Sequence, residues 1–217
     1  MKSIFHSFTL TACLLATVGA TAHAQNLITN ADFSGGNTGF TSDYEFVLTN
    51  ISTTPTAEYG VVLLSNTWNI NFPAFGDNTP GISNMLIANG SAVAGQAFWS
   101  QTVAVTQNTT YVFSGFATSA FTQSAPVIEY FAGTTSLGII TPSTATPGTF
   151  EFFTGTWNSG TNTSVELRLV DNNLAENGND LAVDDLSFVA VPEGSTAALL
   201  ALVGVPMLGF LRRRATK

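Results

Sequence analysis

Two adjacent carboxylates, Asp184 and Asp185, could together bind a metal ion. Asp184 and Asp185 interrupt an apolar stretch, residues 181–188, in which the other residues alternate as in a β-strand. The apolar positions lie on one strand face before the pair and on the other face after it. This slip predicts a β-bulge that turns a carboxylate towards the interior or the rim of the sheet.

Two negative charges this close destabilise the fold unless a positively charged side chain or a metal ion neutralises them. The sequence offers them almost no positively charged side chain. The chain has 6 Lys and Arg against 14 Asp and Glu, a net charge of −8. Between Gln25 and Glu193 lie Arg168 alone and all 14 acids, which leaves −13 for that segment and argues against nucleic acid as a partner. A hard metal ion is the natural partner of Asp184 and Asp185, and hydrogen-bonded carboxylates that face solvent are the alternative.

A second candidate site is the Asn-rich loop at residues 66–77. Trp68 lies there among several Asn, and Asp77 ends the loop. A large ring beside amides and a carboxylate suits a platform for a sugar, but a hydrophobic lid over the end of a sandwich has the same composition. Trp68 and Asp77 are therefore candidate ligand contacts, whereas Trp99 and Trp157 lie in alternating strands and are expected in the core.

Several kinds of catalysis are excluded by the residues that are missing. Between Gln25 and Glu193 there is no His, Cys or Lys, which excludes an imidazole base, a thiolate, a Schiff-base amine and a His or Cys metal site. A carboxylate pair of the kind that hydrolyses glycosides is the remaining route. No spacing among the glutamates singles out an acid and a base, so we expect that the protein is not an enzyme.

The elements that must position these residues are β-strands. Alternation of period two recurs at residues 44–48, 102–106, 111–116 and 165–169, with polar turns between them. Between Gln25 and Glu193, no stretch sustains an apolar helical period over 11 or more residues. Short strands at regular spacing predict one all-β domain at residues 25–190, a sandwich in which Glu166 and Arg168 share an outer face as a surface pair.

The N-terminus, residues 1–24, predicts a secretory signal peptide. Lys2 supplies the positive start, an apolar stretch follows, and Ala22 and Ala24 place small residues at a signal peptidase cleavage site. The mature chain would then begin at Gln25. An alternative is a lipobox that ends at Cys13.

The C-terminus, residues 191–217, has three parts in a fixed order. Pro192 and Glu193 are followed by an apolar run at 197–211 and by an arginine cluster, Arg212, Arg213 and Arg214. The run has 15 residues, fewer than the roughly 20 that span a bilayer, so a weak membrane anchor is one interpretation. The layout resembles the PEP-CTERM sorting signal of Gram-negative bacteria that produce exopolysaccharide, with Gly194 where that family usually has Pro.

Four segments of the domain resemble galactose-binding-like jelly-rolls of the carbohydrate-binding-module type. They are residues 26–40, 77–90, 98–114 and 178–188, with Asn78 in place of a His. The resemblance implies a jelly-roll β-sandwich flanked by the signal peptide and a hydrophobic sorting helix. It also implies a structural Ca²⁺ that joins the closing strand to the opening segment, with Asp32 and either Asp184 or Asp185 as ligands.

Together the two resemblances imply an exported protein of the cell surface or exopolysaccharide matrix. An exosortase would process its tail, and the inner membrane would hold it only transiently, before that step. Its role would be structural or adhesive, with extracellular polysaccharide as a possible partner. The alternatives are a dedicated carbohydrate-binding protein and a carboxylate-type glycosidase.

Overall fold

A computed structural model describes residues 25–50, 57–79 and 83–192 of the 217-residue chain. The predicted signal peptide, with Ala22 and Ala24, lies outside these residues. So do Glu193, the apolar run and the arginine cluster of the predicted sorting signal, whereas Pro192 is described and exposed. Within the described ranges, no helix has the length and apolar character needed to cross a membrane.

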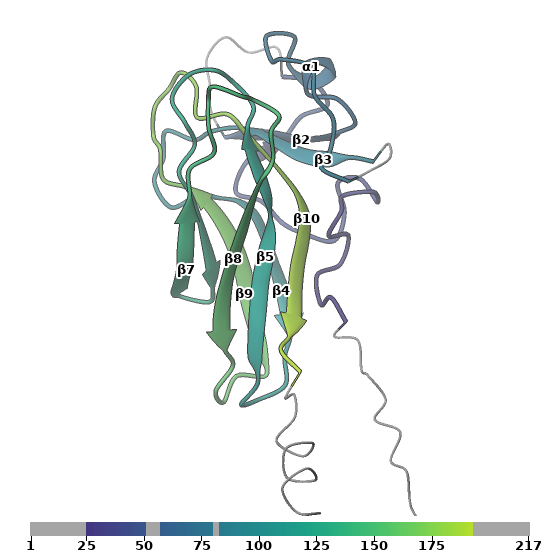
Figure 1. Cartoon of the computed structure of the whole chain (residues 1–217), viewed down its shortest axis with the longest axis vertical. Coiled ribbons are helices and arrows are strands. Elements are labelled where there is room, and N and C mark those ends of the chain that lie inside the picture. Colours follow the sequence, from purple (N-terminus) through teal and green to yellow (C-terminus); the bar gives the residue numbers. More distant parts are fainter. Residues whose placement is uncertain (1–24, 51–56, 80–82, 193–217) are drawn as a thin grey trace, which may run out of the picture.

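The domain is built from two β-sheets packed face to face (Figure 1). The six-stranded sheet has the order β1 (Glu45–Phe46), β2 (Glu58–Val62), β3 (Met85–Asn89), β10 (Leu181–Ala190), β5 (Thr110–Ser119) and β8 (Glu151–Asn158). The four-stranded sheet has the order β4 (Ala97–Ala104), β9 (Ser164–Asp171), β6 (Ile128–Ala132) and β7 (Thr135–Ile140). Neighbouring strands are antiparallel except β1 and β2. This arrangement confirms the predicted all-β jelly-roll sandwich.

Most predicted strands extend further than the alternation alone indicated. The segment at 111–116 is part of the ten-residue β5, and 102–106 overlaps the end of β4. The segment at 44–48 shortens to the two residues of β1 because it pairs only with β2, at the sheet edge.

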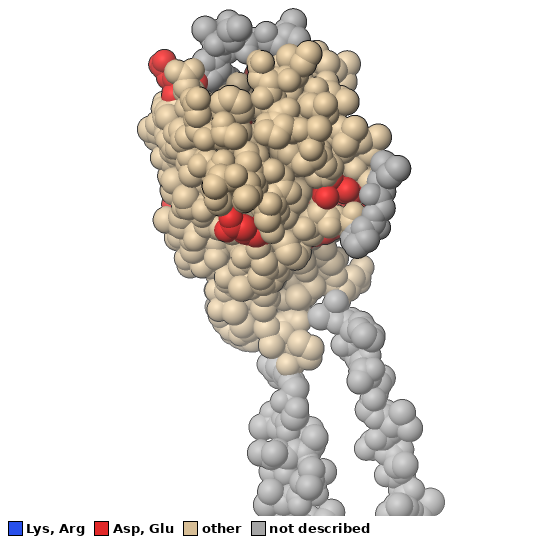
Figure 2. All heavy atoms as spheres, turned by 45° about the horizontal axis from the view of Figure 1, so that its top comes forward, with Lys and Arg blue, Asp and Glu red and all other residues tan. Residues whose placement is uncertain are grey.

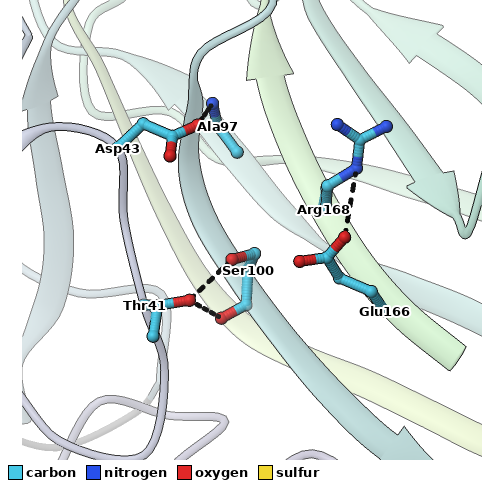
Figure 3. A network of polar contacts seen from close by, with 6 residues as sticks. All are labelled: Thr41, Asp43, Ala97, Ser100, Glu166 and Arg168. Atoms are coloured by element: carbon cyan, nitrogen blue, oxygen red, sulfur yellow. Dashed lines mark hydrogen bonds and ion pairs between the residues drawn. The ribbon is translucent and has the colours of Figure 1, made fainter. Parts of the chain in front are cut away.

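The main core lies between the sheets and is rich in aromatic rings. In β9 the side chains of Val165, Leu167 and Leu169 point into it, as alternation predicted. Glu166 and Arg168 face outwards, with 3.9 Å between Arg168 Nε and a Glu166 carboxylate oxygen (Figure 3). The predicted surface pair is confirmed, and at this exposure it contributes under about 1 kcal/mol.

A second hydrophobic cluster covers the outer face of the six-stranded sheet. The only helix of the described residues, α1 (Ser65–Trp68), begins the cover segment, which we define as residues 65–79. Trp68 and Phe72 of this segment pack on Met85 and Ile87 of β3 and on Ala182 of β10. The larger sheet is therefore buried on both faces where β3 and β10 pair, and all five residues of β3 are buried.

The predicted bulge lies in β10. The register with β5 shifts between Asp184 and Ser187, and Asp185 adopts a left-handed conformation with φ +50°. The extra residue returns the later apolar side chains to the same face as the earlier ones, so Leu186 and Phe188 also join the main core.

The segment before β1 closes an open edge of the smaller sheet. Thr41 and Ser100 of β4 exchange both backbone hydrogen bonds, at 2.8 and 2.9 Å, and their hydroxyls lie 2.8 Å apart. The Asp43 carboxylate accepts the Ala97 backbone N–H at 2.8 Å (Figure 3). These contacts occupy groups of an edge strand that would otherwise be free to pair with another chain.

Candidate functional site

A surface hollow of about 400 Å³ opens at the end of the sandwich where β5 ends and β10 begins, the upper end in Figure 1. We call it the amide pocket. The cover segment, the end of β3, the loop after β5 and the loop before β10 all contribute to its walls. Its lining residues are Asn69, Asn71, Phe72, Asn89, Phe121, Gln123, Glu176, Asn177, Gly178 and Asp180.

The lining combines side chains that suit a hydroxyl-rich ligand. Each of the five amides presents both a donor and an acceptor, and two carboxylates add strong acceptors. Asn69 is committed to the fold, since its Nδ2 donates to Asn50 Oδ1 at 2.9 Å and its Oδ1 accepts the Asn71 N–H at 2.9 Å. Asn71, Gln123 and Asn177 are exposed at the rim. These three amides are best placed to exchange water for ligand.

One acid of the pocket lining, Asp180, is buried, and a second buried acid, Asp171, acts on its ionisation without lining the pocket. Asp180 lines it with 5% of its surface exposed, and burial together with the charge of Asp171 raises its pKa to about 7. Asp171 is 1% exposed, and burial raises its pKa to about 6 although its Oδ1 accepts the Val127 and Asn173 N–H groups at 2.8 and 3.0 Å. The charge of Asp171 therefore opposes the ionisation of Asp180.

Trp68 is placed differently from the prediction. Only 1% of its surface is exposed, its indole N–H donates to the Val47 carbonyl at 3.0 Å, and its ring packs 5.9 Å from that of Phe72. A ring so buried has no free face for a sugar, so the prediction of a stacking platform at Trp68 is corrected in favour of a lid. Trp99 is buried as predicted, and Trp157 is half-buried against the main core.

The aspartate pair in β10 is tied to the end of the cover segment. Asp184 is fully buried, and one carboxylate oxygen accepts the Asn78 N–H at 2.9 Å, whereas Oδ1 has no hydrogen-bond partner. Burial raises the Asp184 pKa to about 7, and the nearby charges of Asp185 and Asp77 act in the same direction. Asp185 accepts from Asn78 Nδ2 at 2.9 Å and from Thr79 Oγ1 at 2.7 Å.

The other predicted aspartates lie near this pair in different surroundings. Asp32 and Asp185 both line a second surface hollow of about 570 Å³. Asp32 is exposed, and hydrogen bonds from Ser34 lower its pKa. Asp77 is half-buried and accepts the Ser83 N–H at 2.9 Å. The hollow thus brings Asp32 to Asp185, while Asp184 is buried beneath Asn78.

A metal centre made only of His, Cys, Asp and Glu does not form in the described part of the chain, where no three such residues gather. The predicted Ca²⁺ site with Asp32, Asp184 and Asp185 therefore remains a prediction. Its donor set would have to include backbone or amide oxygens, which Ca²⁺ accepts. The unpartnered Asp184 oxygen is the feature that fits such an ion.

The visible surface carries few charges. In Figure 2 uncharged residues dominate, acidic side chains appear in separate places, and no Lys or Arg is visible on this face. An anionic polymer would find little positive surface here.

Comparisons with solved structures place this fold among known ones. A Stig cyclase from Fischerella sp. TAU matches with a TM-score of 0.54 and 16% identity, over 78% of this chain and 99% of the cyclase. The CBM22-1 xylan-binding domain from Paenibacillus barcinonensis Xyn10C matches with a TM-score of 0.50 and 11% identity, over 74% of this chain and 92% of that domain. No protein-family model matches the chain, and no curated protein matches it significantly. The class these matches define is a jelly-roll β-sandwich like that of carbohydrate-binding modules.

The prediction that the chain is not an enzyme is contradicted by the cyclase comparison. Proteins with this fold include catalysts, and this chain matches almost the full length of one. The prediction rested on the missing His, Cys and Lys and on the lack of a glutamate spacing that singles out an acid and a base, but spacing in the sequence does not show which carboxyl groups the fold brings together. At 16% identity the similarity shows the fold and transfers no activity.

Much of the amide pocket was missed from the sequence. Asn69 and Asn71 belong to the loop that was singled out, but Gln123, Glu176 and Asp180 were not selected as site residues. Asn is dense at residues 172–180, just before the closing strand, and this run was the available signal. Whether this Asn-rich run forms a site depends on which other loops lie beside it in the fold, and the sequence does not show that.

Proposed function

We propose that the protein is an exported surface or matrix protein that binds glycan in the amide pocket. The observation that carries this proposal is the lining itself: five amides and two carboxylates around two aromatic rings, in a hollow of about 400 Å³. Sugar hydroxyls are recognised by groups that donate and accept at the same place, and amides do both. A jelly-roll like that of a xylan-binding domain is compatible with this role.

The charge of the pocket selects among glycans. Glu176 and Asp180 supply two acids, and the pocket lining contains no cation. An anionic polysaccharide would have to be desolvated next to these acids without a positive partner. We therefore propose neutral polysaccharide as the ligand class.

The test uses two rim variants and a matched amide outside the pocket. Gln123→Ala and Asn177→Ala each remove an exposed amide, and each should weaken glycan binding roughly three- to tenfold, the value of about one hydrogen bond. Asn158→Ala is the control, because Asn158 ends β8 at the opposite end of the sandwich. Affinity electrophoresis on neutral and acidic polysaccharides measures the effect.

Equal retardation of all four proteins, or of none, on every glycan contradicts this proposal. The same incubations should be assayed for new reducing ends, since Glu176 and Asp180 share the pocket and the fold occurs in enzymes. Release of sugar would show that the pocket cleaves what it binds.

We further propose that the two ends of the chain direct export and sorting. Signal peptidase would cut after Ala24, and an exosortase would process the segment that begins at Pro192 and Glu193 and ends in Arg212, Arg213 and Arg214. The domain would leave the inner membrane of a Gram-negative bacterium for the cell surface or the exopolysaccharide matrix. The sequence pattern supports this proposal.

A structural Ca²⁺ at the closing strand belongs to the same proposal. Asp32 across the hollow and either Asp184, with its unpartnered oxygen, or Asp185, at the bulge, would supply its carboxylates. Calorimetric melting with Ca²⁺ and with chelator tests it, and loss of the difference in Asp184→Asn would assign the effect to this site.

A further inference from the structure

A second group of unpartnered oxygens lies at the other end of β10, behind the amide pocket. Asp171 Oδ2 and Asn179 Oδ1 are buried and have no hydrogen-bond partner, and these two residues are 1% and 0% exposed. Buried acceptors without a partner are rare, and each one needs a proton, a water or an ion to offset its lost hydration. Asp180, which lines the pocket, follows Asn179 directly.

Asp171 and Asn179 are both hydrogen-bonded to the backbone of Asn173. The Asn173 N–H donates to Asp171 Oδ1 at 3.0 Å, and Asn179 Nδ2 donates to the Asn173 carbonyl at 2.7 Å. The Asp171 charge acts on Asp180 and also on Tyr44, whose hydroxyl accepts the Ser91 N–H at 3.1 Å.

The Asn179 amide is fixed against the backbone by a glycine. A Cβ on residue 90 would lie 2.2 to 2.3 Å from the atoms of the Asn179 amide, so only glycine at this position leaves room for the amide. Asn179 itself has a left-handed backbone with φ +58°. The amide thus has a single orientation, with its nitrogen bonded and its oxygen unpartnered.

We propose that a hard divalent cation of the calcium class binds here, held by the carboxylates of Asp171 and Asp180 and by the side-chain oxygen of Asn179. Carboxylate and amide oxygens are the ligands that this class prefers, and waters complete its shell. Asp180 reaches the amide pocket, which gives the ion a path from solvent.

No side chain of the described residues offers a positive charge in place of the ion. Arg168 is the only cation there, and it lies on the outer face of β9 beside Glu166, whereas Asp171 continues the inward series of that strand. A water or a shared proton would satisfy only some of the unpartnered oxygens. The experiment below distinguishes these two alternatives from a bound ion. The site is separate from the one proposed at Asp32, Asp184 and Asp185.

The experiment measures calcium binding to the full chain after chelator treatment. Titration calorimetry gives affinity and stoichiometry for the wild type, Asp171→Asn, Asp180→Asn and the control Asp184→Asn. We expect both pocket-end variants to lose more than about tenfold in affinity at one site, since even an indirect ligand contact is worth this much. Asp184→Asn should keep that site.

The same variants should fold well without metal. In Asp171→Asn an oxygen still accepts the Val127 and Asn173 N–H groups, and one of two like charges is gone, so its melting temperature in chelator should equal or exceed that of the wild type. Added calcium should raise the melting temperature less than in the wild type.

Two results overturn the proposal. If the wild-type chain binds no calcium, the unpartnered oxygens of Asp171 and Asn179 are satisfied by water or a proton instead. This result needs no variant. Pocket-end variants that bind calcium with wild-type affinity and stoichiometry assign the ion elsewhere. Neither result depends on glycan binding, so this inference and the proposed glycan binding fail separately.

Discussion

Trp68 is held at a precise depth by contacts that leave no part of its ring to a ligand. Its N–H is bonded to Val47 and its ring packs on Phe72, with 1% of its surface exposed. Its contribution is therefore to the stability of the cover segment and, through that segment, to the walls of the amide pocket.

Replacing this ring should destabilise the protein. We expect Trp68→Ala to lower the free energy of unfolding by about 3–5 kcal/mol, the usual cost of a cavity left by a buried Trp. Urea denaturation measures the loss, and Leu48→Ala, at a side chain 80% exposed, should stay within about 0.5 kcal/mol of the wild type. A Trp68→Ala chain of wild-type stability that no longer binds glycan would restore the stacking interpretation.

Three buried aspartates give the stability a dependence on pH. Burial raises the pKa values of Asp171, Asp180 and Asp184 to about 6, 7 and 7 from an ordinary value of 3.8. Between about pH 4 and 7 the folded chain holds protons that the unfolded chain has lost. Their stabilising contribution is complete below about pH 4 and is lost as pH rises through 7.

We therefore expect the free energy of unfolding, measured in chelator, to be higher at pH 4.5 than at pH 8. Urea denaturation at a series of pH values tests this, and Asp171→Asn should flatten the dependence because that residue no longer ionises. Stability that is constant or rises over this range in the wild type would contradict the raised pKa values. Chelator is needed because a bound cation would favour the ionised carboxylates.

Among the elements, the cover segment and β2 approach each other unusually closely. A Cβ on Gly60 of β2 would lie 2.4 Å from Trp68 Nε1, so the strand needs glycine at this position. We expect Gly60→Ala to cost about 1–3 kcal/mol of stability by forcing the indole away from β2. Gly76→Ala is the control, because the nearest atom to its Cβ would be at an ordinary 3.5 Å. Thermal melting of the two variants tests this prediction. Equal melting temperatures would show that the cover segment can move away from β2 at no cost in stability.

The bulge in β10 determines which side chains of this strand enter the main core and which contact the cover segment. One extra residue at Asp185 keeps four apolar side chains of β10 in the main core, while Asp184 reaches the cover segment on the opposite face. Asp185 then accepts two hydrogen bonds from residues 78 and 79. The bulge thus links the closing strand, the opening segment and the cover segment at one point.

For the whole molecule, the charges are divided unevenly along the sequence. All 14 acids lie between Gln25 and Glu193 with one arginine, and five of the six cations belong to the two ends. If both ends are removed, the product is strongly acidic and contains no thiol. Such a domain stays soluble and avoids anionic polymers.

The proposed export and sorting predict where the mature chain begins and ends. In a host with an exosortase, the mature protein should begin at Gln25 and lack the arginine cluster, and intact-mass spectrometry of the secreted fraction measures both ends. In a strain without exosortase the arginine cluster should remain and the chain should fractionate with the inner membrane. A lipid-modified N-terminus at Cys13 would contradict the signal peptidase site.

The local features of this protein could be predicted from the order of its residues. Period-two alternation predicted the strands, the slip at residues 184–185 predicted the bulge, and the outward Glu166 and Arg168 followed from one strand. These features depend on residues a few positions apart, because side chains alternate along a strand whatever it pairs with.

Tertiary structure alone decided the site. The amide pocket joins four separated segments, from Asn69 to Asp180, and Asp171 meets Asp180 only because β9 and the start of β10 end at the same side of the sandwich. Trp68 is a lid because Gly60 lets it approach the sheet. Burial and proximity across the fold set these outcomes, and neither is a property of a short stretch of sequence.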